Sequence, residues 1–196
     1  MTLGQALAAQ CSLMRGTDMP SMTSLTGVAG EHYVLFELLR GGYIAALAPT
    51  GVPNADIVVT DIDGSRLCSI QVKTRRGVGR DRGWHMQEKH EKALGERHFY
   101  CFVDLQVELG MAPNVYVMPS AEVAKVLRIT HQNWASTLGK KGQLRNPTRM
   151  RRLMPDFTIR DGAGTQYPAG WMSSYLSAWQ NLKLDPIDPD RSIPEE

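Results

Sequence analysis

Four polar residues stand in segments of the sequence that are otherwise apolar. Glu31 shares a predicted helix face with Val34, and Asp56 directly precedes the run IVVT. Gln71 and Lys73 alternate within SIQVKT, so they share one face of a predicted strand. A buried carboxylate or ammonium group is costly unless it is paired, bound to a metal or placed at the rim of the core. Carboxylate and carbonyl oxygens are ligands that Mg²⁺ prefers, and a nearby lysine can orient water and stabilise charge on phosphate oxygens. If these residues converge, they predict a metal centre that acts on phosphate esters.

The elements that would bring these residues together follow from the pattern of the chain. Residues 28–40 (VAGEHYVLFELLR) consist of strong helix formers and end at two glycines, which predicts a helix. A short apolar strand is expected at 43–47. Residues 56–60 and 66–74 flank an Asp-Gly turn, which predicts a β-hairpin. Because paired strand ends lie within a few ångströms of each other, this hairpin can place Asp56 beside Gln71 and Lys73.

The remaining pattern predicts an α/β domain with a mixed central β-sheet flanked by helices. Strands are expected at 99–107 and 115–118, a helix with Ser120 as its N-cap to about residue 127, and a C-terminal helix at 171–182. We expect one domain over 24–184, with a core of about 24–127 and a C-terminal helical extension over 128–184. Residues 1–23 are expected to form a weakly ordered extension, and the Pro-rich acidic residues 185–196 a disordered tail.

Composition restricts the class of protein. With 42% hydrophobic and 21% charged residues in 196, the chain is globular rather than disordered. The sequence contains no run of 18 apolar residues, which a membrane-spanning helix would need. A net charge of +2 is too small on its own to indicate nucleic-acid binding. The three cysteines form no zinc or CxxC pattern, so we expect a reduced cytoplasmic protein with buried thiols.

Three motifs in order resemble the PD-(D/E)xK nuclease superfamily, with a layout closest to its Holliday junction resolvase-like branch. They are GVAGEHYVLFELLRGGY, NADIVV and SIQVKT, and the resemblance covers about residues 24–105. It implies a restriction endonuclease-like core in which Glu31 is the helix carboxylate and Asp56 the principal metal ligand. It further implies that Lys73 is the catalytic lysine and that Val72 offers its backbone carbonyl to Mg²⁺ or Mn²⁺.

Two departures from the family pattern stand out. The usual Pro-Asp is Ala55-Asp56 here, which affects only turn geometry. The acid before the lysine is Gln71, a variant that some active members of the superfamily carry. A neutral amide removes one charge from the metal site.

The expected function is therefore metal-dependent endonucleolytic hydrolysis of DNA, with Glu31, Asp56, Gln71 and Lys73 as the catalytic set. Asp56, Glu31, Gln71 and the Val72 carbonyl are the expected metal ligands. Duplex or branched DNA is the expected partner, and the resemblance adds a homodimer. One alternative is a catalytically degenerate nucleic-acid-binding or interaction module on the same fold. A second is a protein of this fold without any nucleic-acid partner, which the small net charge favours.

Basic residues that could contact phosphates cluster in two segments. The predicted nucleic-acid-binding residues are Arg75, Arg76, Arg80, Arg82, Lys140, Lys141 and Arg145. The first segment is favoured because it adjoins the metal site, whereas the second also fits a solvated loop. For Trp84, His85, Lys89 and His90 we expect a surface or packing role.

Each site residue also has an ordinary explanation when taken alone. Glu31 could pair with a basic side chain at the domain edge, and Asp56 could cap a turn. Lys73 could extend its amine to water from the end of a strand. Their joint occurrence in the order of the family favours the metal site.

Overall fold

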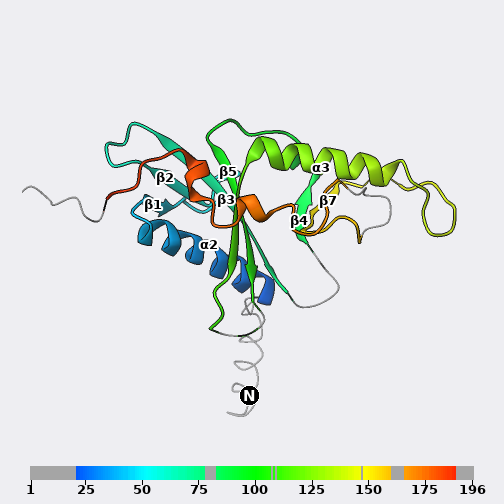
Figure 1. Ribbon diagram of the computed structural model, residues 1–196, viewed down its shortest axis with the longest axis horizontal. Coiled ribbons are helices and arrows are strands. Elements are labelled where there is room, and N and C mark those ends of the chain that lie inside the picture. Colours follow the sequence, from blue (N-terminus) through cyan, green and yellow to red (C-terminus); the bar gives the residue numbers. More distant parts are fainter. Residues whose placement is uncertain are drawn as a thin grey trace, which may run out of the picture.

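A five-stranded mixed sheet forms the centre of the molecule (Figure 1), in a computed structural model that describes residues 21–77, 83–106, 108, 110–146, 148–159 and 166–188. The strands, in spatial order, are β1 (Ile44–Leu47), β2 (Ile57–Thr60), β3 (Leu67–Arg76), β5 (His98–Leu105) and β6 (Asn114–Pro119). The first three form an antiparallel meander, β5 runs parallel to β3, and β6 runs antiparallel to β5. The predicted hairpin is confirmed, with Ile57 opposite Ile70.

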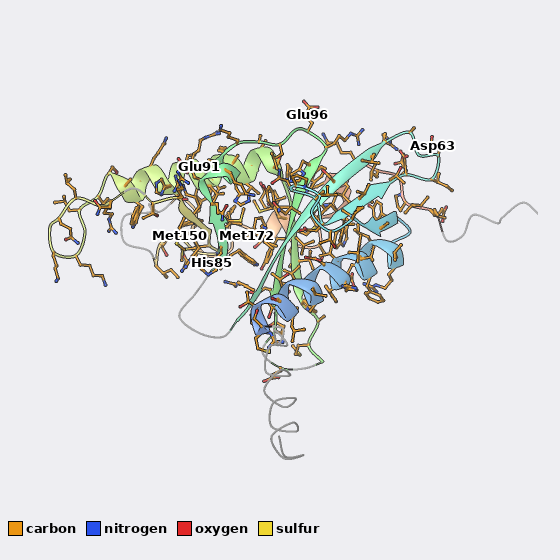
Figure 2. The ribbon with its side chains drawn as sticks, turned by 180° about the vertical axis from the view of Figure 1, so that it is seen from behind. Asp63, His85, Glu91, Glu96, Met150 and Met172 are labelled. Atoms are coloured by element: carbon orange, nitrogen blue, oxygen red, sulfur yellow. The ribbon has the colours of Figure 1, made fainter. Side chains whose placement is uncertain are left out.

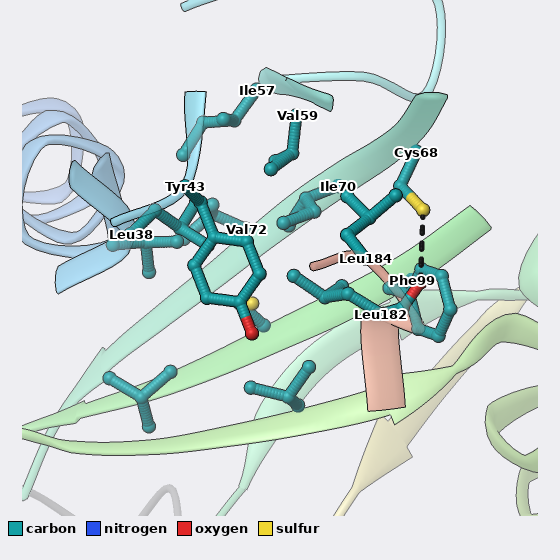
Figure 3. Close-up of a cluster of buried hydrophobic side chains, with 14 of the residues drawn as sticks. Leu38, Tyr43, Ile57, Val59, Cys68, Ile70, Val72, Phe99, Leu182 and Leu184 are labelled. Carbon is teal, nitrogen blue, oxygen red and sulfur yellow. Dashed lines mark hydrogen bonds between the residues drawn. The ribbon is translucent and has the colours of Figure 1, made fainter. Parts of the chain in front are cut away.

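Helix α2 (Met22–Arg40) covers one face of this sheet. Its buried positions are Gly30, Val34 and Leu38, which are spaced four residues apart and so lie along one side of the helix. Val34 and Leu38 pack against alternate residues of the hairpin, including Ile57 and Ile70, in the cluster of Figure 3. The helix begins at Ser21, whose hydroxyl accepts a hydrogen bond from the Ser24 amide at 3.1 Å.

The opposite face is covered by helix α3 (Ser120–Ala135) and by a small antiparallel sheet. That sheet pairs β4 (Trp84–Gln87) with β7 (Met150–Leu153), and a 3₁₀ turn, η2 (Glu88–Glu91), follows β4. The buried side chains of this face include Trp84, Tyr100 and Phe102. Because neighbouring residues of a strand point to opposite faces, the odd-numbered residues of β3 point to this second layer.

The fold class predicted from the sequence is confirmed. A helix, an antiparallel meander and a further strand parallel to β3 match the restriction endonuclease-like core that the sequence resemblance implies. Helix α3 is longer than predicted, and its N-cap is Pro119 rather than Ser120. The Ser120 hydroxyl instead bonds to the loop before β5, where it accepts from the Leu94 amide and donates to the Gly95 carbonyl.

The predicted C-terminal helix is wrong. Residues 171–182 form two 3₁₀ turns instead, η3 (Ser173–Tyr175) and η4 (Trp179–Leu182). Tyr175 packs in the layer with α3, whereas Trp179 packs in the layer with α2. Between them, Ser177 donates from its amide to Val115 of β6, so the segment passes along that edge strand from one face to the other. A single helix could not pack against both faces of the sheet.

A few residues on either side of the predicted domain, 24–184, take part in its structure. Residues 21–23 belong to α2 and its N-cap, and residues 1–20 lie outside the described residues. Residues 185–188, predicted to be disordered, lie against the domain: Asp185 pairs with Arg66, and the Ile187 amide donates to the Gly42 carbonyl at 2.8 Å. Residues 189–196 lie outside the described residues.

Two of the three cysteines, Cys68 and Cys101, are buried free thiols, and Cys11 is not among the described residues. Burial raises the pKa of both thiols. Within the described ranges, no helix is long and apolar enough to cross a membrane.

Candidate active site

Asp56 lies where the β2–β3 hairpin pairing ends. Its backbone amide donates to the Ile70 carbonyl at 2.8 Å, and its Oδ2 atom accepts from the Val72 amide at 2.7 Å. The carboxylate therefore takes the place of a backbone partner at the point where β2 and β3 separate. In a β-strand, the N–H and C=O of one residue point to the same edge. The Val72 carbonyl therefore lies on the edge that Asp56 occupies.

Glu31 reaches the same place from α2. The helix approaches β3 closely there, because Gly30 leaves no side chain between the helix and Thr74. Burial raises the pKa of Glu31, and the negative charge of Asp56 raises it further. The positive charge of Lys73 acts in the opposite direction. The three predicted charged residues therefore share one electrostatic environment.

Lys73 lies in the middle of β3, on the face that points away from α2. Burial lowers the pKa of its ammonium group, and Asp56 and Glu31 oppose that effect. Lys89 of η2 adds a like charge that lowers the pKa further. A desolvated lysine that feels the charges of two carboxylates is suited to orient a water molecule or to stabilise charge that develops on a phosphate.

Gln71 is buried, with 8% of its surface exposed, and lies two residues before Lys73 on the same face of β3. Its Oε1 atom has no hydrogen-bond partner among the described residues. A buried amide oxygen without a partner costs free energy, so this atom is suited to bind a cation or a water molecule. The described residues contain no group of three or more His, Cys, Asp or Glu side chains arranged to hold a metal. The oxygen donors that the predicted site residues offer are instead two carboxylates, one amide oxygen and one backbone carbonyl.

The predicted nucleic-acid-binding residues fall into different environments. Arg75 pairs with Asp104, and its guanidinium lies 4.3 Å from the centre of the Trp84 ring, so it is engaged within the domain. Arg76, the next residue, is exposed at the end of β3. Arg80 and Arg82 lie outside the described residues.

The second basic segment is not brought to the carboxylates. Lys140, Lys141 and Arg145 lie in the loop after α3, which projects from the far end of that helix (Figure 1). Arg145 lies 5.0 Å from the centre of the Trp134 ring and donates to Thr137. The structure therefore brings Glu31, Asp56 and Lys73 into electrostatic contact and bonds Asp56 to Val72, whereas this loop lies apart from them. Gln71 lies two residues before Lys73 on the same strand.

Sequence reasoning missed a group of buried polar side chains beside Gln71. His90, His98 and Tyr100 are each buried and each have a polar atom without a partner in the described part of the chain. Tyr100 pairs in register with Gln71 on the adjacent strand, and its ring meets those of both histidines edge to face. Strand alternation in HFYCFV could have shown that His98 and Tyr100 share a face, whereas the burial of His90 depends on the tertiary fold.

Comparison with known proteins gives structural likenesses that include a homing endonuclease and a Holliday junction resolvase, both distant. No family model matches the chain, and no curated protein does. The bacterial homing endonuclease I-Ssp6803I is similar with a TM-score of 0.45 and 15% identity, covering 84% of this chain and 94% of that one. Hjc, a Holliday junction resolvase from the archaeal hyperthermophile Archaeoglobus fulgidus, has a TM-score of 0.36 and 16% identity, covering 65% and 83%. Neither likeness is close enough to carry a functional argument.

Proposed function

We propose that this protein is a metal-dependent endonuclease that hydrolyses phosphodiester bonds of DNA. The observation that supports this proposal is that Glu31, Asp56 and Lys73 act on one another electrostatically, and that the strand of Lys73 also carries the buried, unpartnered oxygen of Gln71. Two carboxylates kept close together at a cost in free energy, with a desolvated lysine next to them, are typical of a site built to bind a cation and a phosphate.

The residues present fit Mg²⁺ or Mn²⁺. Asp56, Glu31, Gln71 and the Val72 carbonyl would hold the ion, because hard cations prefer oxygen ligands and Mg²⁺ is commonly bound by one or two carboxylates together with substrate phosphates. When bound, the ion would supply Lewis-acid polarisation of the phosphate and neutralise negative charge. The Val72 amide holds Asp56 in position through its 2.7 Å hydrogen bond.

Lys73 would contribute a positive charge to the binding of the reacting phosphate. Its amine can donate hydrogen bonds to the attacking water and to phosphate oxygens, which fixes the direction of attack. Glu31 and Asp56 counteract the effect of burial on its pKa, and so favour the charged form that this role requires.

Duplex or branched DNA is the proposed substrate, and a homodimer is proposed by family analogy, since cutting two strands calls for two sites. A cytoplasmic location remains a prediction from the cysteine pattern. The second candidate function is a non-cleaving nucleic-acid-binding module on this fold. The neutral Gln71 favours it, because an amide binds a divalent cation less strongly than a carboxylate does.

The test is a calorimetric titration with Mg²⁺ and then Mn²⁺, paired with cleavage of supercoiled, branched and single-stranded DNA. Wild type is compared with Asp56→Ala and Lys73→Ala. Asp63→Ala is the matched control for Asp56, because Asp63 is an exposed carboxylate at the far turn of the same hairpin (Figure 2). The exposed Lys92 provides the corresponding control for Lys73 as Lys92→Ala.

We expect Asp56→Ala to lose metal binding, and both site variants to lose at least about 100-fold in cleavage rate, a loss comparable to removing one charge-stabilising group. The two control variants should keep wild-type behaviour. Cleavage by Asp56→Ala or Lys73→Ala at the wild-type rate would disprove the proposal. DNA binding with a steep salt dependence, without metal binding or cleavage, would favour the second candidate.

A further inference from the structure

Helix α2 carries large apolar side chains on the side that faces away from the sheet, as well as on the side that packs against it. Each of the following is 49–59% exposed: Met22, Leu25, Val28, Phe36 and Leu39. The helix packs against β1, β3 and β5, which all belong to the central sheet (Figure 1). A surface helix normally has polar residues on its outer face, and a helix that is apolar all round is normally buried. The outer face of α2 is therefore a candidate interaction surface.

The spacing of these side chains is that of a seam between two helices. Exposed positions on this face recur alternately after three and four residues, which is the a/d spacing by which helices pack side by side. We call them the outer seam of α2, and they are Met22, Leu25, Ala29, His32, Phe36 and Leu39. Val28 lies beside this seam and extends its apolar surface. The pattern indicates that the partner of α2 is another helix.

The area of the outer seam is close to what a specific interface needs. Four large apolar side chains that are each about half exposed, with Val28 and Ala29, present on the order of 500 Å² in one strip, the size of the largest apolar patch on a typical monomer. Covering this strip on two copies of the chain removes on the order of 1,000 Å² from water, at which size specific interfaces begin. A second copy is therefore a partner of sufficient size.

The seam is also complementary to itself when two copies of α2 run antiparallel. In a two-fold dimer, residue i of one copy contacts residue j of the other, and j contacts i. One antiparallel register gives three contacts, each made twice: Met22 with Leu39, Leu25 with Phe36, and Ala29 with His32. Large apolar side chains then meet one another, and the imidazole meets the smallest side chain of the seam.

The charges beside the seam do not oppose this pairing. In the same register, Glu37 and Arg40 lie opposite Ser24 and Ser21, so no like charges of the two helices face each other. Arg40 is already paired with Glu37 of its own helix at 2.8 Å. Antiparallel helices also place the positive end of one helix dipole beside the negative end of the other. The register is therefore free of electrostatic repulsion between the copies.

We propose that the outer seam of α2 is the interface of a homodimer, in which α2 of one copy packs antiparallel against α2 of a second copy. The inference rests on the proposed function for the homodimer, to which it gives an interface, and it does not depend on Asp56 or Lys73. Phe36 supplies the strongest contact, because it is the largest side chain of the seam and aromatic residues carry much of the energy of interfaces.

Sedimentation equilibrium of the whole chain over a concentration series, without DNA or metal, measures the dissociation constant of the dimer. We expect Phe36→Glu to raise this constant at least about tenfold, because it removes an anchor and buries an unpaired charge. Leu144→Glu is the matched control, because Leu144 is 82% exposed in the loop after α3. The control should dimerise like wild type, and circular dichroism should show equal helix content in both variants.

Disulfide cross-linking tests the register. Met22→Cys and Leu39→Cys are made separately, each together with Cys11→Ser, since Cys68 and Cys101 are buried. The proposed register places position 22 of one copy opposite position 39 of the other, whereas copies of one position lie about 25 Å apart along the pair at 1.5 Å per residue. A disulfide needs Cα atoms within about 7 Å of each other. The two variants should therefore cross-link when mixed, and neither should cross-link alone.

A wild-type chain that stays monomeric at every concentration would overturn the inference. If removal of residues 1–18 then produced a dimer, the seam would belong to that segment of the chain and not to a second copy. A dimer that Phe36→Glu leaves intact would also overturn it, because the interface would lie elsewhere. Cross-linking of either cysteine variant with itself would refute the antiparallel register.

These readouts need neither metal nor cleavage, so they separate this inference from the proposed nuclease. A dimer that depends on Phe36 and cleaves no DNA under any metal condition would support the interface and refute the nuclease. Cleavage by a chain that is monomeric at the assay concentration and above would support the nuclease and refute the interface. Asp56→Ala, which should abolish metal binding, should dimerise like wild type.

Discussion

Gly30 is the position at which the packing of α2 determines where Glu31 lies. A Cβ atom at residue 30 would lie 1.8 Å from Oγ1 and 2.8 Å from Cγ2 of Thr74 on β3. Because both distances are shorter than atoms can approach, the helix and the strand would have to move apart. We therefore predict that Gly30→Ala destabilises the fold, although alanine favours a helix more than glycine does.

The magnitude follows from two opposing contributions. Overpacking a filled interface costs about 1–3 kcal/mol, whereas replacing glycine by alanine in a helix gains roughly 0.5–1 kcal/mol. The net loss expected for Gly30→Ala is about 0–2.5 kcal/mol. Gly27 is the matched control, because it lies one turn earlier in α2 and a Cβ there meets no atom within 4 Å. Gly27→Ala should stabilise the protein by about 0.5–1 kcal/mol.

Urea unfolding measures this difference, provided that the dependence of the unfolding free energy on urea concentration is unchanged among the variants. Gly30→Ala should also reduce cleavage, because Glu31 is carried away from Asp56, whereas Gly27→Ala should not. The Thr74 hydroxyl has no hydrogen-bond partner in the described residues, so Thr74→Ala removes the closest contact without losing a hydrogen bond. The double variant should recover part of the stability. Equal stability of Gly30→Ala and Gly27→Ala would refute the reasoning.

Two further predictions concern charged groups. Arg75→Ala should destabilise the fold by about 1–3 kcal/mol, because it removes the pair with Asp104 and the contact with Trp84, and it should leave the salt dependence of DNA binding unchanged. Arg76→Ala should leave the stability unchanged and lower the slope of log affinity for DNA against log salt by about one, which fluorescence anisotropy would show. Acidification should destabilise the protein through His90, because the fold lowers the pKa of this residue to about 4. Below about pH 6.5 the unfolded chain therefore binds more protons than the folded chain, and the free energy of unfolding falls by up to about 3 kcal/mol at pH 4. Urea unfolding at several pH values checks this, and a wild-type profile matching that of His90→Asn would contradict it.

The parts of the fold that the sequence predicts are those set by local pattern. Residues 28–40 read as a helix because their apolar spacing and their glycine stop are both local, and the hairpin follows from one Asp-Gly turn between two β-branched runs. The pairing of β4 with β7 was not predicted, because it joins segments more than 60 residues apart and MRRL carries no strand alternation of its own. The helix predicted at 171–182 was wrong for a related reason. Its aromatic residues have the spacing of a helix, yet they pack in two different layers.

The candidate site likewise has some features that follow from the sequence and others that depend on the tertiary fold. The approach of Asp56 to Val72 follows from hairpin register, which a sequence can supply, and the nearness of Glu31 follows from a helix that must cover the sheet. The inward position of Arg75 could not be predicted, because it depends on Asp104 and on a ring from another strand. The burial of His90 likewise depends on a turn, Glu88–Glu91, that packs against the domain from outside the motif.

The neutral side chain at position 71 is consistent with its burial. Glu31 already has a raised pKa through desolvation and the charge of Asp56, so a third carboxylate, buried at position 71, would add a further cost. An amide supplies an oxygen at lower cost but leaves less negative charge to hold a cation. Binding of the ion then depends more on oxygens that the substrate itself brings.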